Sequence, residues 1–202
     1  MEDIESSQTS SIKNAEQLLK QGKDSSDLNA ALNLYEQALE IYKKHKEKAG
    51  IASAYNNIGV TYARLQQQES ALNYLENSLA LWEEITDKEK EAIALLNIGW
   101  VYKTFNQIFQ ALEFYYKALN IHQEIGNQKE LADTLQIIGA AHEKKAIKFY
   151  RQAIKVYKEI GDNQALEDIF NNTKIAELEE TPVESDDGDK DPIIIIPDPD
   201  PK

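Results

Sequence analysis

Side chains that could catalyse a reaction or hold a metal ion are few in this sequence and form no known catalytic motif. The chain has no cysteine, which excludes a disulfide scaffold, a thiolate zinc site and a cysteine nucleophile. Its histidines, His45, His122 and His142, follow no metal-ligand spacing, and no phosphate-loop or nucleophile-elbow motif occurs. The many carboxylates alternate with lysines at helical spacings, which is typical of a solvated helix face. We therefore expect no enzyme activity, no metal and no cofactor.

Two asparagines are better placed for recognition than for catalysis. Asn57 and Asn97 each stand two residues before a glycine and lie forty residues apart. A side-chain amide donates and accepts hydrogen bonds at once, so it matches both the C=O and the N–H of a peptide unit. The alternative, that both amides bond only to neighbouring helices, stays open.

The spacing of these asparagines belongs to an internal repeat. Four segments align with one another, the first more faintly than the others: residues 13–44, 54–87, 94–127 and 134–162. Gly59, Gly99 and Gly139 mark the period of forty residues. Within each copy, apolar residues recur every three or four positions on both sides of a short polar stretch. This pattern predicts a helix A, a turn and a helix B in each copy.

The small residues of each copy have predicted structural roles. A glycine inside a helix costs about 1 kcal/mol relative to alanine, so the repeated glycine indicates a close approach of helix B. Ala71 and Ala111 are expected to meet Gly59 and Gly99 there. Each joint between copies is expected to combine a left-handed residue with an Asx N-cap. These joints are Thr86-Asp87, Gly126-Asn127 and Gly161-Asp162.

This arrangement resembles the tetratricopeptide repeat family. The resemblance is carried by the mid-helix glycine, the aromatic residue three positions on, the alanine of helix B and a small residue seven positions beyond it: Gly59, Gly99, Gly139, Tyr62, Tyr102, Ala71, Ala111, Ala146, Ser78, Ala118 and Ala153. The usual repeat of the family has about 34 residues and a closing proline. Copies of forty residues without that proline are similar to the extended-repeat branch that includes kinesin light chains and regulators of G-protein signalling. The resemblance implies an all-α fold, a right-handed α-solenoid of antiparallel helix hairpins with about four repeats and a capping helix over residues 163–180.

In such a solenoid the helices A line a concave groove, and the resemblance implies that asparagines grip the backbone of a bound peptide there. The predicted peptide-binding residues are Asn56, Asn57, Val60, Arg64, Ile93, Asn97, Trp100 and Lys103. Trp100 is expected to anchor a partner or, alternatively, to pack between repeats. The set of lysine, asparagine and arginine residues with which chaperone-binding members clamp a terminal carboxylate is not assembled, so such a ligand is not expected.

The fourth copy lacks five residues where the turn between its helices belongs. The remaining join, residues 140–146, contains no helix-breaking residue, which predicts one fused helix over about residues 131–160. Burial of the apolar face of helix B favours a tight turn instead. A fused helix would leave that face for a second copy of the chain, which makes a homodimer a prediction. The residues predicted for this self-association are Phe149, Tyr150, Ile154 and Tyr157.

Charge and composition limit the remaining classes of protein. A net charge of −13 over 202 residues argues against nucleic acid as a partner, because phosphate binding needs clustered lysines and arginines. The longest apolar run, residues 193–196, is far shorter than the roughly 20 residues of a membrane span. Residues 1–12 show no targeting pattern, so a cytoplasmic location is expected. These residues are also expected to be disordered.

Residues 13–180 are predicted to form the solenoid, and residues 181–202 an acidic disordered tail. The tail contains four consecutive isoleucines at 193–196. They could add as a strand to a partner or lie in the protein's own groove. Alternatively, they belong to a disordered end in which proline and aspartate act against aggregation.

We therefore predict a non-catalytic scaffold or adaptor for protein–protein interaction, which binds an extended peptide or a helix of a partner in the groove. The alternative is a structural module that dimerises through the irregular fourth repeat.

Overall fold

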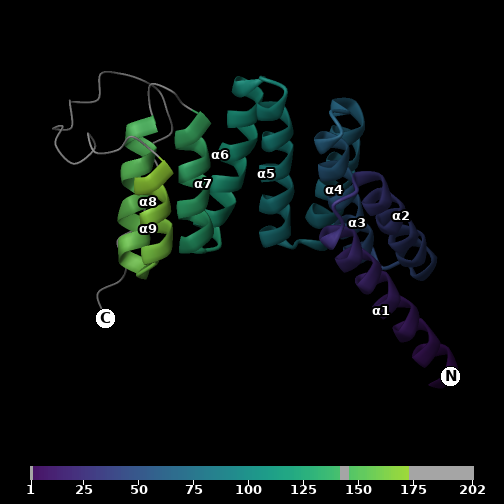
Figure 1. Cartoon of the computed structure of the whole chain (residues 1–202). Coiled ribbons are helices and arrows are strands. Elements are labelled where there is room, and N and C mark those ends of the chain that lie inside the picture. Colours follow the sequence, from purple (N-terminus) through teal and green to yellow (C-terminus); the bar gives the residue numbers. More distant parts are fainter. Residues whose placement is uncertain (1, 142–145, 173–202) are drawn as a thin grey trace. The chain divides into compact units, whose positions relative to one another are not determined.

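The computed structural model describes residues 2–141 and 146–172, with side chains over residues 7–141 and 152–169. Throughout these residues the chain forms α-helices joined by short turns, without a β-strand (Figure 1). The helices are α1 (Glu2–Asp24), α2 (Leu28–His45), α3 (Lys48–Arg64), α4 (Gln68–Ile85), α5 (Lys88–Thr104), α6 (Ile108–Glu124), α7 (Gln128–Ala141), α8 (Ala146–Ile160) and α9 (Asn163–Asn172). The predicted all-α fold is confirmed.

Helices that follow one another in the chain pack together. In the first compact unit, Met1–Ile125, α1 packs on α2, α3 on α4 and α5 on α6, and α2 also contacts α3 as α4 contacts α5. In the second unit, Gly126–Lys202, α7 packs on α8, and α8 contacts α9. The predicted succession of helix hairpins is confirmed, with α1, α3, α5 and α7 as the helices A.

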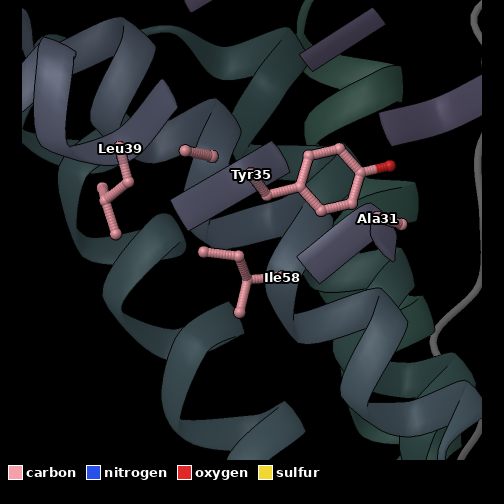
Figure 2. Close-up of a cluster of buried hydrophobic side chains, with 5 residues drawn as sticks. Ala31, Tyr35, Leu39 and Ile58 are labelled. Carbon is pink, nitrogen blue, oxygen red and sulfur yellow. The ribbon is translucent and has the colours of Figure 1, made fainter. Parts of the chain in front are cut away.

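Apolar contacts between a helix B and the next helix A join the hairpins. Ala31, Tyr35 and Leu39 on α2 form a buried cluster with Ala54 and Ile58 on α3 (Figure 2). The three α2 residues are spaced four apart, so they form one apolar stripe along that helix. Burying this stripe fixes α2 against α3.

From α2 to α7, each turn between consecutive helices contains a residue with a left-handed backbone, and these residues recur every twenty positions. These residues and their φ angles are Lys46 (56°), Gln66 (61°), Thr86 (62°), Asn106 (60°) and Gly126 (70°). A helix of 17 or 18 residues and one short turn together make up the twenty residues. Two such steps produce the forty-residue repeat that the sequence shows.

The three predicted joints are confirmed. Thr86, Gly126 and Gly161 have φ angles of 62°, 70° and 74°. At each joint the following Asx side chain accepts a hydrogen bond from a backbone N–H of the next helix. The caps and their donors are Asp87 with Lys90 (3.0 Å), Asn127 with Glu130 (3.4 Å) and Asp162 with Ala165 (3.1 Å).

The predicted close approach of helix B to the mid-helix glycine is also confirmed. A Cβ atom at Gly59 would lie 3.0 Å from the carbonyl oxygen of Ala71. A Cβ atom at Gly99 would lie 3.1 Å from the carbonyl oxygen of Ala111 and 2.4 Å from the ring of Tyr115. The hairpins can pack this closely only because no side chain occupies these two positions.

The prediction of a fused helix over residues 131–160 is wrong. Helix α7 ends at Ala141, and α8 begins at Ala146 and packs back against α7. The hydroxyl of Tyr157 donates to a carboxylate oxygen of Asp133, whereas these two residues would lie about 36 Å apart in a continuous helix. Burial of the apolar face of α8 outweighs the helical preference of the join. The join itself, residues 142–145, lies outside the described residues.

Helical structure begins before residue 13, the predicted start of the solenoid. Residues 2–12, which were expected to be disordered, lie in α1, and Ile12 packs against a buried cluster that contains Ala15 and Tyr42. The predicted capping helix begins as α9 at Asn163. Residues 173–180 of that helix and the acidic tail, residues 181–202, lie outside the described residues.

We expect Thr86→Gly to raise the free energy of unfolding by about 0.5–1 kcal/mol. A β-branched residue in the left-handed region costs the folded state roughly 1–2 kcal/mol, which glycine avoids. Glycine also increases the conformational entropy of the unfolded chain, and this offsets part of the gain. Urea unfolding followed by circular dichroism measures the change. The matched control, Thr104→Gly in the last turn of α5, should destabilise the protein by about 0.3–0.5 kcal/mol. A loss of stability in Thr86→Gly would contradict the account of the turn.

The sign of the change in the free energy of unfolding in Gly99→Ala shows whether helix propensity or packing dominates at this position. Propensity alone would make it stabilising by about 1 kcal/mol. Because the new methyl group would meet the Tyr115 ring and the α6 backbone, we expect the free energy of unfolding to fall by about 1–3 kcal/mol. Thermal and urea unfolding both report the sign, and a gain in stability would show that the hairpin is not closely packed there.

Candidate functional site

The eight residues predicted to bind a peptide all lie on two helices A of the first unit, α3 and α5. Five of them are half-buried: Asn56, Asn57, Val60, Ile93 and Asn97. The other three are exposed: Arg64, Trp100 and Lys103. Helices α3 and α5 contact one another directly, although α4 lies between them in the sequence. We call these eight residues the α3–α5 surface.

An amide hydrogen bond joins the two helices within this surface. The Nδ2 group of Asn97 donates to Oδ1 of Asn56 at 2.8 Å. Asn97 is equivalent to Asn57 in the forty-residue repeat, but in the structure it bonds to Asn56, the residue before Asn57. This contact uses one donor of Asn97 and leaves its carbonyl oxygen available.

The Asn57 side chain differs from that of Asn56 in its hydrogen bonding. Its backbone carbonyl accepts a hydrogen bond from the hydroxyl of Thr61 at 2.7 Å, but within the described residues its side-chain amide has no hydrogen-bond partner. Asn57 is only half-buried, so water or a ligand can satisfy this amide.

Trp100 is 36% exposed on α5, which is unusual for so large an apolar side chain. The corresponding position in the preceding repeat is Val60, which is half-buried. Phe109, at the start of α6, is 90% exposed and was not among the residues predicted from the sequence. No periodic signal marks Phe109, because the preceding copy has Glu69 at that place.

Exposed cations occur at the C-terminal ends of three helices A in the first unit. The last turns of α1, α3 and α5 contain Lys23, Arg64 and Lys103, and Lys20 lies one turn earlier on α1. All four side chains are exposed, and in the part of the chain that the structure describes none forms an ion pair. Other lysines of the unit do pair with carboxylates, such as Lys48 with Glu84 at 2.6 Å.

A hollow of about 430 Å³ lies between α1, the C-terminal end of α2 and the start of α3. Leu19, Tyr42 and Ala49 contribute apolar surface to it, while Lys20 and Lys23 supply cations. Burial, followed by the nearby carboxylates Glu16 and Glu47, raises the pKa of Tyr42, so its hydroxyl stays protonated at neutral pH. The sequence did not reveal this hollow, because it forms only when α1 packs beside α3.

The predicted self-association residues lie in the second unit. Tyr157 is fully buried between α7 and α8, and its hydroxyl also lies 3.3 Å from Oε1 of Gln136. Burial, followed by the hydrogen bond to Asp133, raises the pKa of Tyr157. Tyr157 therefore belongs to the core and not to an exposed interface, which corrects that prediction. Ile154 is half-buried, and the side chains of Phe149 and Tyr150 lie outside the described residues.

Neither a metal-binding cluster nor a membrane-spanning helix occurs among the described residues. No group of three or more His, Asp or Glu side chains among those residues could hold a metal ion. None of the helices described has the length and apolar character needed to cross a bilayer.

Comparison with known structures identifies the fold. A Rap protein complexed with competence and sporulation factor is 21% identical, with a TM-score of 0.70 over 77% of this chain and 46% of that chain. Aspartyl phosphate phosphatase F from Bacillus subtilis is 20% identical, with a TM-score of 0.70 over 75% of this chain and 42% of that chain. MamA is 24% identical, with a TM-score of 0.55 over 74% of this chain and 81% of that chain. This chain thus spans less than half the length of the first two proteins.

We expect the hydrogen bond between Asn56 and Asn97 to stabilise the first unit. Asn56→Ala and Asn97→Ala should each lower the free energy of unfolding by about 1 kcal/mol. In the double variant the loss should be smaller than the sum of the two, by about 0.5–1.5 kcal/mol. The control cycle pairs Asn57→Ala with Asn97→Ala and should be additive. Additivity in both cycles would mean that the amide contact contributes nothing to stability.

Sequence comparison finds a family model that matches part of the chain. A search of curated protein sequences found no match. Residues 50–124, which include most of α3 and all of α4, α5 and α6, match the family model described as tetratricopeptide repeat. The predicted resemblance to the tetratricopeptide repeat family is thereby confirmed over residues 50–124.

Proposed function

We propose that this chain is a non-catalytic protein-interaction module that binds an extended peptide or a helix of a partner protein along the α3–α5 surface. The observation that carries the proposal is the group of half-buried amides on two adjacent helices A. Asn57 has no side-chain hydrogen-bond partner in the described residues, and Asn97 keeps an acceptor beyond its bond to Asn56.

Half-buried side-chain amides can match the hydrogen-bonding groups of a peptide backbone. A bound peptide loses water from its N–H and C=O groups, and this loss is costly unless new partners replace the water. Side-chain amides supply both a donor and an acceptor. Trp100, partly exposed on the same helix as Asn97, offers apolar area to a side chain of the peptide.

The comparisons support an interaction role without assigning a partner. Tetratricopeptide repeats are repeat units of a kind that builds extended binding surfaces. One similar structure contains a Rap protein complexed with competence and sporulation factor. That ligand belongs to the Rap protein, of which this chain spans less than half.

A non-catalytic role is part of the proposal. One protein of similar structure is named a phosphatase, and that name applies to that protein. In this chain, several carboxylates of the described helices form exposed ion pairs, such as Glu113 with Lys117 at 2.6 Å. Carboxylates in such solvated pairs are not arranged for acid–base or nucleophilic chemistry.

The test begins with a library of random peptides of about twelve residues displayed on phage and selected on the full chain. The affinity of a selected peptide is then measured for the variants Asn57→Ala and Asn97→Ala, each shown by circular dichroism to be folded. We expect each variant to bind at least about tenfold more weakly, which corresponds to about 1.4 kcal/mol.

The matched controls are Asn73→Ala and Asn77→Ala, which remove exposed amides from α4. They should leave the affinity unchanged. Equal affinity for the wild type and both α3–α5 variants, or an equal loss in the α4 controls, would refute the proposal. Light scattering on the same samples shows whether the binding species is a monomer.

A further inference from the structure

The hollow beside α1 has the features of a site for a segment that is both apolar and acidic. Its volume of about 430 Å³ lies within the range of roughly 300–1,000 Å³ that is usual for ligand pockets. Leu19, Tyr42 and Ala49 offer apolar contact, and Lys20 and Lys23 lie at the same hollow. Apolar surface beside unpaired cations suits an aliphatic side chain with a carboxylate nearby.

The two lysines are not accounted for by contacts within the described residues. Neither Lys20 nor Lys23 forms an ion pair there. Lys23 lies in the last turn of α1, where a cation favours the helix dipole. Lys20 is one turn earlier, where this effect has fallen off. Glu16 and Glu47 also line the hollow, so the site carries both signs of charge.

One segment of the chain has the complementary composition. Residues 177–202 carry a net charge of −8, and within them four consecutive isoleucines at 193–196 stand between prolines and aspartates. The flanking residues include Asp191, Asp198 and Asp200, with Lys190 as the nearest cation. The prolines at 192 and 197 disfavour a helix, so an extended form suits this segment. The segment thus combines aliphatic side chains with carboxylates on both sides.

We propose that residues 189–200 of the chain bind the hollow of the same molecule, with isoleucine side chains on the apolar surface and aspartates beside Lys20 and Lys23. Sixteen residues, 173–188, connect Asn172, the last residue of α9, to this segment, and when extended they span up to about 55 Å. The hollow includes Ser53, one helical turn before Asn56 on α3. The segment is therefore a built-in competitor at one end of the α3–α5 surface, and this inference rests on the proposed function of that surface.

The first experiment uses the full chain and a tail variant in which Ile193→Ser, Ile194→Ser, Ile195→Ser and Ile196→Ser are combined. A fluorescein-labelled synthetic peptide with the sequence of residues 187–202 is titrated with each protein by fluorescence anisotropy. We expect the peptide to bind the tail variant at least fivefold more tightly than the wild type, because the intact tail competes for the hollow. Equal affinities, or no binding to the tail variant, would overturn the inference.

Charge-reversed variants locate the contact. In the tail-variant background, Lys20→Glu combined with Lys23→Glu should weaken peptide binding at least tenfold. The matched control, Lys44→Glu combined with Lys90→Glu, makes the same change in charge at exposed positions outside the hollow. An equal loss in both pairs would mean that binding is non-specific attraction between charges, and the inference would fail.

Hydrogen–deuterium exchange on the full-length proteins tests whether the contact lies within one molecule. The wild type should exchange more slowly than the tail variant at the C-terminal end of α1 and the N-terminal end of α3, and equally so at all protein concentrations. Protection that grows with concentration would assign the site to the tail of a second copy and overturn the proposal as stated.

Failure here is distinguishable from failure of the proposed function. The library peptides report on Asn57 and Asn97, whereas the tail peptide reports on Lys20 and Lys23. A tail peptide that does not bind leaves the asparagine dependence of the library peptides unaffected.

Discussion

The close contact between helix A and helix B at the mid-helix glycine is the constraint on which the first unit depends. At Gly59 and Gly99 the backbone of the partner helix comes so near that a single methyl group would collide with it. The same close packing lets the buried hydroxyl of Ser78 on α4 donate to the carbonyl oxygen of Ala52 on α3 at 2.8 Å. With this face of helix A closed by helix B, Asn57 and Trp100 lie on a less buried part of their helices. The packing and the candidate binding surface thus use different faces of the same helices.

The sequence was sufficient to predict the structure wherever that structure depends on local interactions that recur at a fixed period. Thr86-Asp87 and Gly126-Asn127 were recognised as joints because a left-handed residue followed by an Asx cap has a short-range signature. The glycine positions were explained correctly because a residue that opposes helix formation must be retained for packing. For the site, the period placed the eight candidate residues on α3 and α5, as the structure shows.

The sequence was insufficient to predict the structure where contacts between distant segments determine it. The join at residues 140–146 favours a helix locally, yet burial of Tyr157 against α7 makes the chain fold back. The period placed Asn57 and Asn97 at equivalent positions but did not indicate that Asn97 bonds to Asn56 on the neighbouring helix. The hollow beside Lys20 needs α1, α2 and α3 together, so no spacing within one helix could indicate it. In each case the missing information is the relative position of helices.

The most direct test of the central claim, that the α3–α5 surface binds partners, is hydrogen–deuterium exchange of the full chain with and without a peptide selected from the library. We expect slower exchange on α3 and α5 when the peptide is bound, with α4 and the second unit unchanged. Protection confined to α4 or to helices α7, α8 and α9 would contradict it, because the bound peptide would then lie on a face without Asn57, Asn97 and Trp100.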